Sequence, residues 1–159
     1  MRFAVGVSFT KADACYISKE LQSSLWHRAS PDLALAPTNS IETSDVVFRL
    51  MDNEDIIRAY GSSFSRLSVC DRGVKPITIT FNRENWELGV PAFSSVDAYR
   101  RYLVNHEIGH ALGMDHLEPN GASRDMPVMF QQTPGIPRGM RANSVPLPYE
   151  IELLKKKLK

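Results

Sequence analysis

Apolar and polar positions alternate with a period of two in several short segments of the first 118 residues, and these segments predict strands. Large apolar side chains occupy every second position of Phe3–Thr10, which predicts a strand ending near Thr10, and Ile77–Asn82 shows the same alternation. Val46–Met51 is an almost unbroken apolar stretch, typical of a strand buried on both faces. Arg66–Cys70 predicts a further short strand, which the turn residues Asp71–Gly73 would join to Ile77–Asn82 as a hairpin.

A period close to four predicts two longer helices. Thr10 and Asp13 have the spacing of a capping box, so a helix should begin after Thr10, and Ser30-Pro31 should end it. A second helix is predicted from about Val96 to Leu112, with a serine just before it as the cap. The apolar stripe of the first helix consists of Ala14, Ile17, Leu21 and Leu25.

The character of the chain changes beyond Glu118. Five of the ten prolines lie between Pro127 and Pro148, which predicts an ordered loop without regular structure. Tyr149–Lys159 predicts a short terminal helix in which Glu152 would pair with Lys156.

Together these elements predict an α+β fold, in which a small twisted mixed sheet packs on two main helices and the proline-rich C-terminal part is irregular. A chain of 159 residues suits one domain, and we expect residues 1–159 to form one. Its parts would be the sheet and the second helix in residues 1–118, the loops of residues 119–148, and the terminal helix of residues 149–159.

Composition and charge narrow the classes of partner. Hydrophobic residues make up 43% of the chain and charged residues 23%, as in an ordinary globular domain. The formal net charge is +1, so electrostatics gives no reason to expect nucleic acid or an anionic membrane as a partner. The lysine-rich tail is interpreted as a solvated helix end. No apolar stretch approaches the length of a membrane span. We expect the chain to be a monomer.

The compartment stays open at this stage. The apolar segment at the N-terminus is too short for a signal peptide and is followed at once by charged residues, so the chain is either cytoplasmic or an already mature secreted domain. Cys15 and Cys70 allow one internal pairing, which the sequence does not decide; two free thiols are the preferred interpretation.

The candidate chemistry is concentrated in residues 106–116. His106 and His110 are four residues apart in a helical segment, so both imidazoles lie on one face and can hold one metal ion, with Glu107 beside them. Gly113 follows one turn later and can end the helix in a left-handed turn, which would bring His116 back as a third ligand. Three imidazoles leave one tetrahedral position open, which is typical of a catalytic zinc site.

This pattern is specific. With 4 histidines and 9 glycines in the chain, H-E-x-x-H-x-x-G-x-x-H arises by chance about once in 10⁵ chains of this composition. The competing interpretation, histidines that are merely surface or core groups, is disfavoured accordingly. His27, the remaining histidine, is interpreted as a helix-end residue without a metal role.

The segment resembles the extended zinc signature of the metzincin clan of metallopeptidases. That resemblance implies a methionine turn beneath the histidines, for which Val128-Met129-Phe130 is the candidate, with Met126 as the alternative. It also implies a metzincin-like fold and the hydrolysis of peptide bonds. Many metzincins carry a tyrosine two residues after the methionine; here Gln131 stands at that position.

A closer resemblance is to a poorly characterised bacterial family of predicted secreted metzincin-like domains. It covers about Leu67 to Thr133, and its matching stretches include Asn82–Trp86, Gly89–Phe93, Ala98–Asn105 and Pro127–Met129. The chain departs from those relatives in lacking an export signal and cysteines just after the third histidine.

The mechanism expected from these residues is that of a zinc peptidase. Zn²⁺ held by the three histidines would lower the pKa of a bound water and polarise the substrate carbonyl, and Glu107 would act as general base and then as acid. Gln131 or Tyr149 is a candidate for the oxyanion or the pocket. Asp115 and Asp125 are candidates for orienting a histidine, and placement on the surface is the open alternative for each.

The substrate would be an extended peptide or protein segment on an exposed sheet edge. Arg66–Cys70 is the candidate edge, and the loop from Gln131 to Val145 is the candidate wall of the pocket after the scissile bond.

An endopeptidase is the leading hypothesis, and three alternatives stay open. The first is a zinc aminopeptidase or another small-peptide hydrolase. The second is an inactive binding module that keeps zinc for stability. The third, disfavoured by the net charge, is a nucleic-acid or structural protein that uses the tail Lys155–Lys159.

Overall fold

The computed structural model describes residues 1–121 and 123–159, and its centre is one five-stranded sheet in the order β2-β1-β3-β5-β4. Neighbouring strands are parallel except β4, which pairs antiparallel with β5 and forms one edge. The α+β class, the mixed sheet and the hairpin are therefore confirmed. The strands are β1 (Arg2–Val5), β2 (Ala36–Thr38), β3 (Val46–Met51), β4 (Val69–Asp71) and β5 (Ile77–Asn82).

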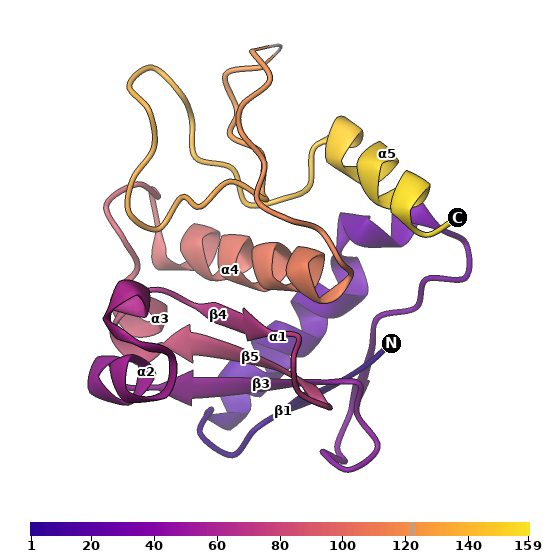
Figure 1. The fold of residues 1–159 in the computed structure, drawn as a ribbon, viewed down its shortest axis with the longest axis vertical. Helices are drawn as coiled ribbons and strands as arrows, with labels where there is room; N and C mark the ends of the chain where they lie inside the picture. The colour runs from indigo at the N-terminus through magenta and orange to yellow at the C-terminus, as the bar shows by residue number, and fades with distance from the viewer. Residues whose placement is uncertain (122) are drawn as a thin grey trace.

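The helices lie mainly on one side of this sheet. Figure 1 shows α4 between the sheet and the long loop that follows it, with α5 beside that loop. The predicted capping box of α1 is present, and the Ser95 side chain caps α4. The helices are α1 (Lys11–Ser23), α2 (Asn53–Tyr60), α3 (Arg83–Leu88), α4 (Val96–Ala111) and α5 (Pro148–Lys157), with 3₁₀ turns η1 (Leu25–Ala29) and η2 (Ser62–Phe64).

The core fills the space between α1, α4 and one face of the sheet. Phe48, Ile79 and Phe81 point to this face from β3 and β5, and they pack in one cluster with Leu21 of α1 and Leu103 of α4. Each of these side chains is at most 1% exposed. Burial of this many apolar groups fixes α4, and with it the histidine segment, against the sheet.

The N-terminal strand is shorter than its alternation predicted. It ends at Val5; Val7 is fully exposed, and Phe9 turns back to pack edge-on against Phe81. The chain leaves the sheet at Gly6, whose N–H donates to the Phe48 carbonyl. Because a parallel inner strand is buried on both faces, alternation was the wrong criterion there.

Other boundaries also differ from the sequence prediction. The first helix ends at Ser23, so Leu25 belongs to a separate 3₁₀ turn rather than to the apolar stripe. Glu152 pairs with Lys155, three residues on, instead of Lys156. Three short elements, β2, α2 and α3, were not predicted, because segments of three to eight residues carry too little periodicity to identify.

Three further expectations can be compared with the described residues. No helix among residues 1–121 and 123–159 is long and apolar enough to cross a membrane. Cys15 and Cys70 are both free; Cys15 is exposed, and burial raises the pKa of the Cys70 thiol to about 12. The loop predicted between Pro127 and Pro148 carries no helix or strand up to Pro148, where α5 begins.

Candidate metal centre

The end of α4 brings the three predicted histidines together. His106 and His110 lie one turn apart on the helix. Beyond it, Gly113 has φ +94°, its N–H donates to the His110 carbonyl, and the Met114 N–H donates to the Gly109 carbonyl. This pair of bonds closes a Schellman turn, which requires a residue free to adopt positive φ. The reversal returns His116 to the other two histidines, as the sequence predicted.

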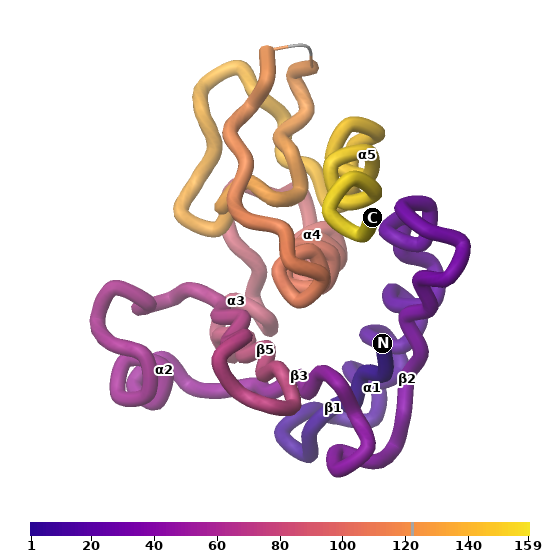
Figure 2. The backbone as a smooth tube through the Cα atoms, turned by 45° about the vertical axis from the view of Figure 1, so that its right-hand side comes forward, coloured from indigo at the N-terminus to yellow at the C-terminus, as the bar shows by residue number. Residues whose placement is uncertain are grey.

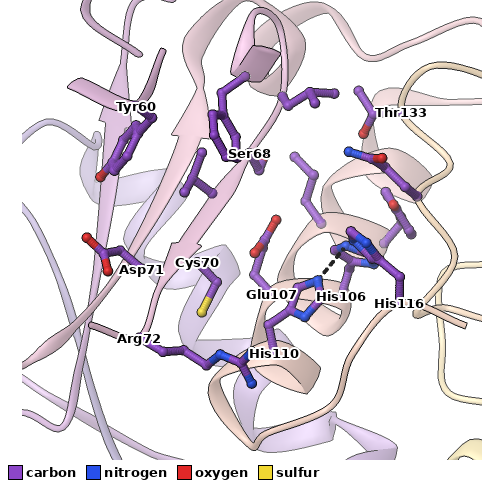
Figure 3. Close-up of a pocket in the computed structure, with 16 residues that line it drawn as sticks. Tyr60, Ser68, Cys70, Asp71, Arg72, His106, Glu107, His110, His116 and Thr133 are labelled. Carbon is purple, nitrogen blue, oxygen red and sulfur yellow. Dashed lines mark hydrogen bonds between the residues drawn. The ribbon is translucent and has the colours of Figure 1, made fainter. Parts of the chain in front are cut away.

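The geometry of the triad fits one metal ion. One ligating nitrogen from each of His106, His110 and His116 lies within 4.8 Å of the others. The Nε2 atoms of His106 and His110 are 3.1 Å apart, and Figure 3 shows the two rings turned toward each other. Nitrogens bound tetrahedrally at 2.0–2.1 Å from an ion would lie about 3.3 Å apart. These residues could therefore hold a metal ion.

Backbone carbonyls fix which ring nitrogen of His106 and of His110 is free to bind a metal. The Val128 carbonyl accepts a bond from His106 Nδ1 at 2.7 Å, and the Met114 carbonyl accepts one from His110 Nδ1 at 2.8 Å. Both Nδ1 atoms must carry protons, because a carbonyl oxygen only accepts. In the neutral rings both Nε2 atoms then present lone pairs to each other, a repulsive arrangement that a cation between them would relieve.

The carboxylates predicted to orient the histidines lie elsewhere. Asp115 is exposed and pairs with Arg72 and Lys157, while Asp125 pairs with Arg141. Neither carboxylate bonds a histidine among the described residues, so the structure favours the alternative of surface placement for both. The helix-end turn and the loop already supply carbonyls to the rings, which leaves these carboxylates to surface ion pairs.

Burial holds the imidazoles in the form that binds metals. Desolvation lowers the pKa of His110 to about 4, and it lowers the pKa values of His106 and His116 as well. The neighbouring imidazoles reinforce the effect on His106. Neutral imidazole is the ligating form, so protons compete weakly with a metal here.

Glu107 stands beside the triad in an unusual state. Its side chain is 2% exposed, and burial raises its pKa to about 8. Its Oε2 atom has no hydrogen-bond partner among residues 1–121 and 123–159. A buried carboxyl group without a partner is costly, and such groups are concentrated at functional sites.

The segment around Met129 forms a floor under α4. Met129 is fully buried, its carbonyl accepts from the Leu117 N–H just after His116, and its sulfur lies against Gly109. Met126 is also buried, but the contact under the helix belongs to Met129. Met129 therefore occupies the place that the sequence assigned to the methionine of the turn.

Close packing at Gly109 yields a prediction about stability. A Cβ atom there would overlap the Met129 sulfur and come within 3.0 Å of Trp26 Cζ2. Gly109→Ala is expected to destabilise the fold by about 1–3 kcal/mol in urea denaturation, the cost of overpacking, although Gly to Ala inside a helix usually stabilises. Adding Met129→Ala should remove most of the penalty of the alanine. A Gly109→Ala variant as stable as the wild type would contradict this packing.

A residue that the sequence analysis did not select holds this floor in place. Glu150, at the start of α5, is fully buried and accepts bonds from the N–H groups of Val128, Met129 and Leu147 at 2.8–3.0 Å. Burial raises the pKa of Glu150, and these three bonds oppose that rise. Because the Val128 carbonyl orients His106, Glu150 positions a candidate ligand through the backbone. A carboxylate in a predicted terminal helix gave no signal of this role.

The triad opens into a cleft of 460 Å³. One wall is the segment from Leu67 to Arg72, and the other is α4 with His116, Gln131 and Thr133. The first wall contains the edge strand β4, which overlaps the predicted edge Arg66–Cys70 only at Val69 and Cys70 because the strand begins three residues later. From the loop Gln131–Val145, only Gln131 and Thr133 contribute to this lining. Tyr149 lies on α5 and is not part of the lining, so its placement at the pocket was wrong.

The neighbour of Gln131 has a structural role instead. Gln132 is fully buried, and its side chain bonds the carbonyls of Pro127 and Asn143 and the Asn143 N–H. These bonds tie the methionine segment to the returning loop. The His27 ring makes hydrogen bonds with the carbonyls of Leu21 and Leu33, and the residue lies outside the triad.

Comparison with known proteins gives one family match. A family model described as "Protein of unknown function (DUF3152)" matches residues 9–143, which include the triad, Glu107 and Met129 but not Glu150. No curated protein matches the chain.

Proposed function

The chain belongs to the DUF3152 family of proteins of unknown function, and we propose that it is a zinc-dependent hydrolase of peptide bonds, acting as an endopeptidase. One observation carries this proposal. Three convergent imidazoles, a buried carboxyl group without a partner and an open cleft meet at one place. A structural zinc site would instead be closed by four protein ligands, and the described residues offer three.

The chemistry divides between the ion and the chain. The three histidines would hold a zinc ion, which would supply a water of lowered pKa and a Lewis acid for the substrate carbonyl. Glu107, in its deprotonated form, would accept a proton at Oε2 from the attacking water and would then donate it to the leaving amine. The Val128 and Met114 carbonyls keep the ligand rings in the required tautomer. Gln131 is the nearest counterpart of the tyrosine found in many metzincins and is our candidate for contacting the oxyanion.

The edge strand supports a peptide as the substrate. Among the described residues β4 is the edge strand, paired with β5, and it lines the cleft. An extended peptide can add there as a further strand. The free edge, the glycine turn after α4 and the buried Met129 also support placing the chain with the metzincin-like peptidases.

Metal and activity measurements test the proposal together. We expect one zinc per chain by elemental analysis and cleavage of an internally quenched peptide whose two ends are blocked. His116→Ala should lose both zinc and cleavage, because it removes one of the three ligands. The variant should still fold, because His116 is exposed and its removal does not open the core. Glu118→Ala, an exposed change two residues away, serves as the matched control.

The alternatives give different results in the same assays. Cleavage restricted to peptides with a free N-terminus would favour a zinc aminopeptidase. Bound zinc without cleavage of any peptide in a mixed library would favour a zinc-stabilised binding module, and absence of bound zinc would reject the proposal.

A further inference from the structure

The edge strand β4 has two chemically different faces. In its pairing with β5, Cys70 lies opposite Ile79, and Val69 lies opposite Thr80. Cross-strand partners share a face of the sheet. Ile79 belongs to the core under α4, so Cys70 faces α4 and Glu107; Val69 faces the other way.

The face turned away from α4 carries an aromatic pair. The Tyr60 hydroxyl contacts Thr80 Oγ1 at 3.1 Å, which places Tyr60 on the same face as Val69. The ring of Phe64 packs edge-on against Tyr60, with centroids 6.2 Å apart. We call Tyr60, Phe64 and Val69 the aromatic ledge; all three line the same cleft as the histidines.

Phe64 is an apolar residue of the cleft that stays partly open to water. Its side chain is 37% exposed, and it lies in the short turn η2, outside the core cluster. Large apolar side chains are costly to leave open to water, and in a cleft they commonly meet a ligand. Asp71 lies on the same face two residues after Val69 and makes an acidic ligand group unfavourable there.

We propose that the aromatic ledge selects substrates with a bulky apolar side chain at every second residue. This inference rests on the proposed function for the identity of the ligand as a peptide. A peptide added to β4 has its side chains alternately on the two faces. Those on one face enter the cleft beside Glu107, and their immediate neighbours rest on the ledge. The preference must therefore have a period of two along the substrate.

Peptide hydroxamates test the period because the hydroxamate chelates the metal and fixes the register. In two polyalanine series, extending N-terminally or C-terminally from the hydroxamate, one Phe is moved through four successive positions. Affinity for the zinc-loaded protein is measured by competition fluorescence polarisation, so no turnover is needed. In at least one series, hydroxamates with Phe at alternate positions should bind about tenfold more tightly than the polyalanine parent. The affinity of hydroxamates with Phe at the intervening positions should not depend on Phe64.

Variants of Phe64 assign the effect to the ledge. Phe64→Ala should abolish the gain at the alternate positions, and Phe64→Leu should keep most of it. Ile41→Ala removes a similarly exposed apolar side chain outside the cleft and should change nothing. A gain at consecutive positions that depends on Phe64, or a gain at the alternate positions that survives Phe64→Ala, overturns the inference.

The two proposals fail in distinguishable ways. An alternating, Phe64-dependent affinity without cleavage of any peptide would leave the peptide groove in place and reject hydrolysis. Cleavage of peptides without an alternating affinity would keep hydrolysis and reject the aromatic ledge. If no hydroxamate binds the zinc-loaded protein, the proposal that a peptide binds along β4 is rejected.

Discussion

Glu107→Gln is expected to lower the turnover of a blocked peptide by about 10²- to 10⁴-fold while the chain keeps its zinc. The amide has the shape of the protonated carboxyl group but cannot accept a proton from water. Glu107 is no member of the ligand triad, and its Oε2 bonds no neighbour, so the histidines should stay in place. Turnover of the quenched peptide, with zinc content and melting temperature measured on the same sample, checks this result.

The control for this substitution is Glu118→Gln, the same chemical change at an exposed position. It should leave turnover unaltered. Loss of zinc by Glu107→Gln would assign Glu107 to metal binding, and equal turnover in variant and wild type would remove it from the mechanism.

Glu150→Ala is expected to produce the largest loss of stability outside the histidine segment. The substitution leaves three backbone N–H groups without their acceptor, two of them in the buried methionine segment. At about 1–3 kcal/mol for each buried donor left unpaired, the free energy of unfolding should fall by about 3–5 kcal/mol. Urea denaturation of the zinc-free chain measures this directly.

The loss should extend to the metal centre. Release of Val128 removes the fixed acceptor of His106 Nδ1, and loss of such support typically weakens metal binding 10- to 100-fold. If Glu150→Ala does not fold, Glu150→Gln keeps one acceptor oxygen and should show a smaller loss of both quantities. Glu152→Ala, an exposed change on the same helix, is the control. Weakened zinc binding in Glu152→Ala would contradict the positioning role. Unchanged zinc binding in Glu150→Gln would contradict it as well.

Long or strongly patterned segments were predicted well. Val46–Met51 and Ile77–Asn82 are strands with the predicted bounds, and α4 ends one residue before the predicted Leu112. Local signals decide such elements: apolar runs, a capping serine and a glycine past the helix end. The strand predicted to Thr10 failed because tertiary pairing, not local pattern, decides where β1 leaves the sheet.

The sequence by itself determined the three histidines, their neighbour Glu107 and the glycine that turns the chain between His110 and His116. Their spacing of four, three and three residues is a property of one continuous segment, so helix and turn geometry suffice to bring the rings together. Only the tertiary structure decided what supports them. The acceptor of His106 lies 22 residues away at Val128, and the carboxylate that holds Val128 lies a further 22 residues along. Contacts between distant segments arise from the packing of the whole fold, which no local pattern encodes.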